Sequence, residues 1–427
     1  MPETLQLRKI RLCNWKSFKD CTIELNKGLN ILVGPNGSGK TNLLEAFKFL
    51  RKALGKLEAP YAPHLEWWTY RNIVYGNDET EPILFELEFE CPEDYTARYE
   101  VAFAWAGSTV KPIYEKFQLD GVLTLVREGD TITIEYEDKF LKKINGESVE
   151  KRKTYTMLYD ITSIFYLWQR FLLHLGGSSK LKGNYFVDYF IVGPGPRLKI
   201  FSPMLVEKQR SLFSYTFFKM REFFEEILFI RHLEMGALRT PLPLVAPLPQ
   251  PIALEERGGN LSLVLFRWIM REGRLPDRID AAVKNLFPEF TISFEQTLDG
   301  RVFLLVKDAI SGTVLHPPSI PDGFYKMLHV ISAIETGPPI LLIDELENSL
   351  HAEVLEYVVE ELKDSGITSI VATHSPVVVD VAGLEHLLLV ERTAEGSKVK
   401  RVKNLEEMKK WMREKGLTPS EMWLAGM

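Results

Sequence analysis

The sequence predicts an α/β fold in which a mixed sheet is flanked by helices and a large insertion separates two halves of one domain. Residues 29–33 form a short apolar run, a glycine-rich loop follows it, and apolar side chains then recur at helical spacing to residue 50. From about residue 255 onward, apolar runs of strand length again alternate with helical patterns. Between these regions, alternating strand patterns are followed by helical spacing, which indicates an insertion with strands first and helices second.

The chain is therefore expected to divide into four segments. Residues 83–90 and 131–136 alternate between apolar and polar side chains, as half-buried antiparallel strands do. The stretch from about 155 to 233 has helical spacing, and the proline-rich residues 241–251 are typical of an extended strap. The expected segments are the first half of a head domain at 1–58, the insertion at 59–254, the second half of the head at 255–395, and a short helical tail at 396–427.

Composition favours a globular protein located in the cytoplasm. The 427 residues are 45% hydrophobic and 26% charged, and no apolar stretch is long enough to span a membrane. Three cysteines without a CxxC pair fit a reducing compartment. The formal net charge of −6 gives no general attraction to nucleic acid, so a DNA contact would need a local basic patch.

The loop Gly34-Pro35-Asn36-Gly37-Ser38-Gly39-Lys40-Thr41 matches the P-loop pattern GxxxxGK[ST] at every fixed position. Its glycines permit positive φ angles and a close backbone approach, and the N–H groups at the start of the following helix point at a β-phosphate. Lys40 is expected to reach the β- and γ-phosphates, and the Thr41 hydroxyl to ligate Mg²⁺. The sequence thus predicts a P-loop NTPase that binds ATP with Mg²⁺ through Gly34, Pro35, Asn36, Gly37, Ser38, Gly39, Lys40, Thr41 and Asn42.

Two later strand ends supply the rest of the predicted site. Residues 340–343 form an apolar strand that ends in Asp344 and Glu345. We expect Asp344 to hold the Mg²⁺ water shell and Glu345 to act as the general base for the attacking water. Another apolar strand ends just before His374, at the same edge of an open α/β sheet, and this histidine could donate to the γ-phosphate. The predicted catalytic residues are Glu345, His374 and Lys40, and the predicted metal ligands are Thr41 and Asp344.

Taken together, these residues resemble the ABC-type ATPases of the RecF and SMC kind, and more narrowly the RecF-like AAA-type ATPases grouped with the nucleases of the overcoming-lysogenization-defect type. Residues 10–18 are similar to the family's xNFKSF opening, with Trp15 in place of phenylalanine. Residues 29–44 resemble its Walker A region, 342–351 its Walker B motif and D-loop, and 372–376 its switch histidine. The resemblance covers residues 1–58 and about 255–395, and it implies the fold of an ABC-ATPase head.

The resemblance also implies a homodimer in which each ATP contacts the P-loop of one copy and the signature motif of the other. The expected signature has the form Ser-x-Gly before a helix, and the candidates here are Ser319, Asp322 and Gly323. Gly323 could face the opposite γ-phosphate at a helix N-terminus. Pro321 occupies the place of the serine, which predicts weaker closure and slow hydrolysis. We identify no Q-loop glutamine.

The leading functional hypothesis is an ATP-switched dimer that acts on DNA, in repair or in defence against foreign DNA. The alternatives are a slow or non-hydrolysing regulator, which Pro321 favours, and the ATPase subunit of a separate nuclease, because the segment after Arg392 is too short for a nuclease domain. A transporter ATPase subunit is disfavoured by the missing LSGGQ-like signature. Candidate DNA-contacting segments are Lys142–Lys143, Lys151–Lys153, Lys180, Lys182 and Lys398–Lys403, although such charges more often lie on solvated turns.

Overall fold

The computed structural model describes residues 5–55, 62–129, 131–136, 152–156, 164, 189–190, 198–199, 207–244 and 253–425. The chain forms two compact units, and each is assembled from separated segments. The first comprises Met1–Leu25, Glu45–Glu226 and Arg392–Val399, and the second Asn26–Leu44, Ile227–Glu391 and Lys400–Met427. The four segments expected along the chain stay a prediction. The lysine pairs at 142–143 and 180–182 lie outside the described residues.

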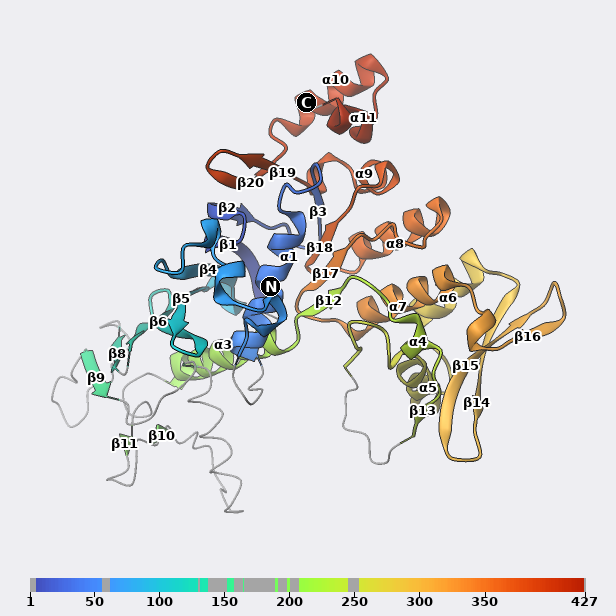
Figure 1. Ribbon diagram of the computed structural model, residues 1–427, viewed down its shortest axis with the longest axis horizontal. Coiled ribbons are helices and arrows are strands. Elements are labelled where there is room, and N and C mark those ends of the chain that lie inside the picture. Colours follow the sequence, from blue (N-terminus) through green and yellow to red (C-terminus); the bar gives the residue numbers. More distant parts are fainter. Residues whose placement is uncertain are drawn as a thin grey trace. The chain divides into compact units, whose positions relative to one another are not determined.

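The second unit is built on a sheet whose strands follow the order β12-β17-β18-β3-β19. These strands, side by side in Figure 1, are β12 (Leu228–Ile230), β17 (Leu341–Asp344), β18 (Ser369–Ala372), β3 (Leu29–Val33) and β19 (Leu387–Thr393). The neighbours from β12 to β19 pair in parallel. Every residue of β3, β17 and β18 is buried, as expected of short apolar strands inside a parallel sheet. Their carboxyl ends therefore meet at one edge, where open α/β sheets bind ligands.

Helices cover this sheet, and one of them is almost wholly buried. They are α5 (Leu261–Glu272), α6 (Asp277–Leu286), α7 (Asp322–Thr336), α8 (Ala352–Asp364) and α9 (Pro376–Ala382). In α7, residues 324–334 are all buried, so this helix lies inside the unit and carries polar side chains into it. An antiparallel group of β13 (Leu242–Pro243), β14 (Phe290–Gln296), β15 (Arg301–Asp308) and β16 (Thr313–Leu315) adjoins the helices. The α/β class and the flanking helices are as the sequence predicts.

A buried histidine in α7 makes the stability of this unit sensitive to acid. His329 is fully buried, its Nε2 lies 2.8 Å from the Glu255 carbonyl oxygen, and burial lowers its pKa to about 4. His329 takes up a proton near pH 6.5 in the unfolded chain, whereas burial opposes its protonation in the folded chain. The contribution of this group to the unfolding free energy is therefore full above pH 6.5 and is lost as the pH drops towards 4.

We expect this group to remove about 2 kcal/mol of unfolding free energy between pH 7 and pH 5. Urea unfolding of the unaltered chain and of His329→Gln at both pH values measures the loss, because glutamine can still donate to the Glu255 carbonyl. The variant should lose less stability on acidification. His316→Gln, at an exposed position, is the control and should behave like the unaltered chain. Equal acid sensitivity of His329→Gln and the unaltered chain would contradict the assignment.

The first unit is built on an eight-stranded sheet of order β2-β1-β4-β5-β6-β7-β8-β9. Its strands are β1 (Gln6–Trp15), β2 (Phe18–Glu24), β4 (Ile83–Glu90), β5 (Thr96–Ala106), β6 (Thr109–Leu119), β7 (Leu123–Glu128), β8 (Thr131–Tyr136) and β9 (Arg152–Thr156). Each strand pairs antiparallel with its neighbours in this order. The expected insertion strands at 83–90 and 131–136 are confirmed, and they extend the N-terminal hairpin instead of forming a separate sheet.

Helical segments also contribute to the core of this unit. They are the part of α1 (Lys40–Leu50) from Glu45 onward, the π-helical turn Arg51–Gly55, and α3 (Glu207–Glu225). Trp15 is fully buried, with its ring 5.2 Å from that of Phe49 and 5.6 Å from that of Phe85. A Cβ on Gly55 would lie 2.5 Å from the Phe224 carbonyl oxygen, so α3 packs at a distance that glycine permits. Strands therefore precede a helix in the insertion, as predicted. Across the described residues, no helix is both long and apolar enough to cross a membrane.

Candidate nucleotide-binding site

The glycine-rich loop links the end of β3 to the start of α1. Gly37 and Gly39 have φ angles of +77° and +114°, in the region that favours glycine. Gly34 is different and corrects the expectation of a positive φ there: its φ is not positive, and a Cβ would lie 2.2 Å from the Val390 carbonyl oxygen of β19. Glycine at position 34 thus lets the loop pack against the neighbouring strand.

Lys40 lies inside this loop. Its side chain is buried, and Nζ donates to the carbonyl oxygens of Gly34 at 2.7 Å and Pro35 at 3.2 Å. Burial lowers the pKa of Lys40, and the carboxylates of Asp344, Glu347 and Glu345 oppose that shift. A partly desolvated ammonium ion at a helix N-terminus is suited to an anionic ligand.

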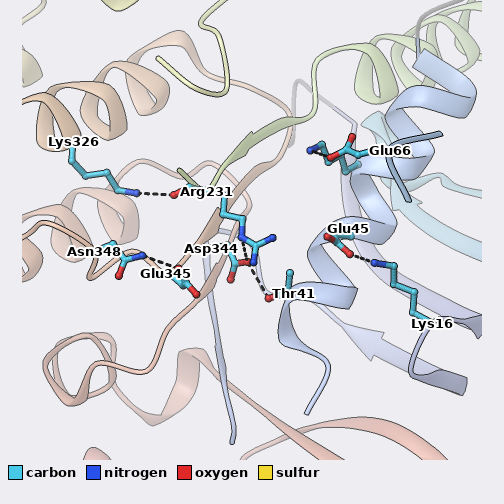
Figure 2. A network of polar contacts seen from close by, with 10 residues as sticks. Lys16, Thr41, Glu45, Glu66, Arg231, Lys326, Asp344, Glu345 and Asn348 are labelled. Carbon is cyan, nitrogen blue, oxygen red and sulfur yellow. Dashed lines mark hydrogen bonds and ion pairs between the residues drawn. The ribbon is translucent and has the colours of Figure 1, made fainter. Parts of the chain in front are cut away.

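Asp344, the last residue of β17, contacts the P-loop, which lies some three hundred residues earlier in the sequence. Its Oδ2 accepts a hydrogen bond from Thr41 Oγ1 at 3.0 Å, and the Arg231 Nε lies 3.2 Å from the same oxygen (Figure 2). The carboxylate is almost fully buried. A hydroxyl and a carboxylate oxygen side by side are the hard ligands that Mg²⁺ prefers, so the two predicted metal ligands fit that ion. Their role as ligands stays a prediction.

Glu345 follows the strand in a backbone conformation that is uncommon outside glycine. Its φ is +55°, its N–H donates to the Ala372 carbonyl oxygen at 3.0 Å, and its Oε2 accepts from Asn348 Nδ2 at 2.7 Å. Figure 2 shows this carboxylate held against Asn348. The surrounding bonds therefore fix a left-handed residue, a kind of strain that gathers at functional sites. The role of Glu345 as general base stays a prediction.

A third carboxylate, which was not predicted from the sequence, links the segment after β17 to the end of β18. Glu347 Oε2 accepts from Thr373 Oγ1 at 2.7 Å, and its Oε1 accepts from the His374 backbone N–H at 2.8 Å. The His374 residue is exposed. Glu347 thus fixes the loop that presents the predicted switch histidine. Its nearness to Asp344 and Glu345 in the sequence was the available signal.

The signature candidates lie at the start of α7, against their own chain. A Cβ on Gly323 would lie 2.7 Å from the Ser349 carbonyl oxygen, so glycine is required here by a contact within one copy. Asp322 pairs with Arg239 at 2.6 Å, and Arg239 Nε also donates to the Pro317 carbonyl oxygen at 3.1 Å. Ser319 and Asp322 are exposed, and Pro321 is the N-cap residue without a side-chain hydrogen bond. Contacts of Ser319, Asp322 and Gly323 with a nucleotide stay a prediction.

Two cationic residues at the site were not predicted. Arg231 directly follows β12 and contacts Asp344. Lys326 is buried in α7, and its Nζ donates to the Arg231 carbonyl oxygen at 3.4 Å. Burial lowers the pKa of Lys326 to about 8, although the carboxylates of Glu347, Glu345 and Asp344 oppose that shift. Arg231 follows a strand of only three residues, and Lys326 interrupts an apolar helix, so neither stands in a recognisable motif.

The parallel sheet, the P-loop at one strand end and the acidic residues at the next strands define a P-loop ATPase of ABC type. Two family models match the chain. One is described as "AAA domain" and matches residues 9–157. The other is described as "AAA domain, putative AbiEii toxin, Type IV TA system" and matches residues 211–380.

Similar proteins include the DNA replication and repair protein RecF of Heliobacterium modesticaldum, 32% identical over 87 residues, which are 20% of this chain and 23% of that protein. The chromosome partition protein Smc of Methanocaldococcus jannaschii is 49% identical over 53 residues, 12% of this chain and 4% of that protein. The matches thus span less than a quarter of these relatives. Among solved structures, the SMC head domain from Thermotoga maritima is 14% identical, with a TM-score of 0.43 over 93% of this chain and 99% of that chain.

The sequence motifs and the two AAA-domain models support a P-loop ATPase that is similar to RecF and SMC proteins. Proteins of this class bind ATP and usually Mg²⁺. The motifs meet at one edge of the parallel sheet, and the alignments with the two named relatives cover 20% and 12% of this chain.

Proposed function

We propose that this chain binds ATP with Mg²⁺ and hydrolyses it, and that two copies close around two ATP molecules. The observation that carries the proposal is the hydrogen bond of 3.0 Å between Thr41 Oγ1 and Asp344 Oδ2. It joins the start of the P-loop helix to the end of β17, which are 303 residues apart in the sequence. A glycine turn that bound nothing would not need a buried carboxylate beside its threonine.

Each side chain of the proposed site has a distinct role. The P-loop residues from Gly34 to Asn42 surround the phosphates, and Lys40 contributes the positive charge. Thr41 and Asp344 hold Mg²⁺, which when bound offsets the charge of the β- and γ-phosphates. Glu345 accepts the proton of the attacking water, and His374 donates a hydrogen bond to the γ-phosphate.

The proposed dimer would complete the site with residues of the second copy. Asp322 and Gly323 begin α7, a helix of 15 residues whose dipole favours a phosphate there, and Ser319 ends the 3-10 turn just before it. Because Gly323 packs against Ser349, a phosphate contact at this helix end would act directly on the segment that carries Glu345. This link supports a site in which closure of the dimer and hydrolysis depend on each other.

DNA is the proposed partner. The relatives named above are a DNA replication and repair protein and a chromosome partition protein, which supports a role on DNA. The basic residues at 398–401 add little: Lys398 donates to the Asp20 carbonyl oxygen, Lys400 pairs with Glu391, and Arg401 donates to Asn30. The proposal of a DNA surface therefore rests on the relatives and not on these charges.

Release of phosphate from ATP by the purified chain, with and without duplex DNA at low and high salt, tests this proposal. We expect Mg²⁺-dependent release that DNA increases at about 50 mM salt and that loses this stimulation at about 200 mM, because phosphate contacts weaken steeply with salt. Release that never responds to DNA would contradict the DNA role but not the ATPase. A chain that binds ATP and releases no phosphate would contradict hydrolysis.

That last outcome would favour the second candidate, an ATP-dependent regulator that hydrolyses slowly or not at all. The observation in its favour is Pro321. A proline at the N-cap of α7 has no hydroxyl to offer a phosphate and no backbone N–H to donate. A nuclease or another effector would then be a separate subunit that responds to the ATP-bound form.

A further inference from the structure

The register of the central sheet brings an arginine to the acidic end of β17. Leu228, Phe229 and Ile230 of β12 pair in parallel with Leu341, Leu342 and Ile343. Arg231 and Asp344 are the next residues on the two strands, so they leave the sheet at the same edge. This edge is also where β3 delivers the P-loop, two strands further along.

The two side chains in this contact differ in their exposure to solvent. Arg231 Nε lies 3.2 Å from Asp344 Oδ2, the same oxygen that accepts from Thr41. The Asp344 side chain is 3% exposed, whereas 38% of the Arg231 side chain is exposed. The buried Lys326 holds the carbonyl oxygen of Arg231, as Figure 2 shows. The backbone at Arg231 is thus held by Lys326, whereas part of the Arg231 side chain is open to solvent.

The Asp344 carboxylate cannot bind Mg²⁺ and the Arg231 guanidinium group equally well at the same time. A guanidinium group about 4 Å from a metal ion would experience a repulsion of several kcal/mol at the effective dielectric constant of a protein surface. A guanidinium group also binds phosphate oxygens in a two-pronged geometry that a carboxylate shares. If Asp344 turns to Mg²⁺, a terminal phosphate at the same sheet edge becomes the better partner for Arg231.

We propose that Arg231 reads the third phosphate of the nucleotide, exchanging Asp344 for a terminal phosphate oxygen when a triphosphate is bound. With a diphosphate that oxygen is missing, and Arg231 stays on Asp344 in competition with Mg²⁺. Arg231 is thereby a residue that sets the preference for the triphosphate over the diphosphate. This inference rests on the proposed ATP site.

The experiment compares the affinities of the full chain for ADP and for a non-hydrolysable ATP analogue, both with Mg²⁺, by titration calorimetry. In Arg231→Ala we expect the analogue to bind about 10-fold more weakly, as for the loss of one charge-assisted contact, while ADP binds as well or better. Arg231→Lys should lie between, because it keeps the charge and loses the two-pronged geometry. The Mg²⁺ concentration needed for half-maximal ADP binding should fall in Arg231→Ala.

Arg278→Ala is the matched control, because Arg278 on α6 also pairs through Nε with a carboxylate, that of Glu361 at 2.8 Å. It should leave both affinities unchanged. Equal losses for the two nucleotides in Arg231→Ala, or none for either, would overturn the role of Arg231 and leave the ATP site intact. An unaltered chain that binds neither nucleotide would instead show that the proposed function itself is wrong.

Discussion

Replacement of Lys40 by alanine should weaken ATP binding about 100-fold or more, which corresponds to roughly 3 kcal/mol. The ammonium group is buried at the start of α1 and is the cation inside the loop itself, so its removal deletes the main charge facing the phosphates. The same change also removes the hydrogen bonds to the carbonyl oxygens of Gly34 and Pro35, which hold the shape of the loop. Both effects act in the same direction.

Fluorescence titration with an ATP analogue carrying a reporter on the ribose measures this loss. The matched control is Lys48→Ala, another lysine on α1, whose side chain pairs with Glu66. That variant should bind as the unaltered chain does, and thermal melting of both variants shows whether they are folded. A folded Lys40→Ala chain with undiminished affinity would remove the basis of the proposed ATP site.

The parts of this site that could be predicted from the sequence are those in which the functional residues directly follow one recognisable strand. The P-loop is contiguous, and its glycines, lysine and threonine are recognisable without any tertiary contact. Asp344 and His374 were found because each follows an apolar run of strand length. Parallel strands deliver their carboxyl ends to one edge, so the nearness of Asp344 to Thr41 followed from the fold class.

The residues that were missed depend on pairings between distant segments. Arg231 follows a strand of three residues, which pairs with β17 across more than one hundred residues of sequence. Gly34 was expected to be a glycine because of a positive φ angle. In the structure, glycine is needed there because a Cβ would collide with the Val390 carbonyl oxygen. β1 pairs with β4, which joins the N-terminal hairpin to the insertion. Several strands have a similar alternating pattern, so the sequence alone does not determine which of them pairs with β1. Periodicity identifies such strands but not their neighbours.

Replacement of Glu345 by glutamine should reduce ATP hydrolysis about 100-fold or more while ATP binding persists. The change removes the ability to accept a proton and retains the side-chain size. A glutamine oxygen can still accept from Asn348 Nδ2, which contacts Glu345 at 2.7 Å, so the left-handed backbone at this position keeps its support. Single-turnover measurement of phosphate release separates this loss from any change in nucleotide affinity.

The same variant tests the dimer, because a head pair that closes on ATP and opens on hydrolysis should accumulate when hydrolysis stops. Sedimentation of Glu345→Gln with ATP and Mg²⁺ should show a dimer, and sedimentation with ADP a monomer. Glu353→Gln, at an exposed position in the first turn of α8, is the control and should hydrolyse ATP normally. Normal hydrolysis by Glu345→Gln would refute its role as the base. A variant that binds ATP without turnover and stays monomeric would refute the head dimer, in which the start of α7 from the second copy has to meet the phosphate.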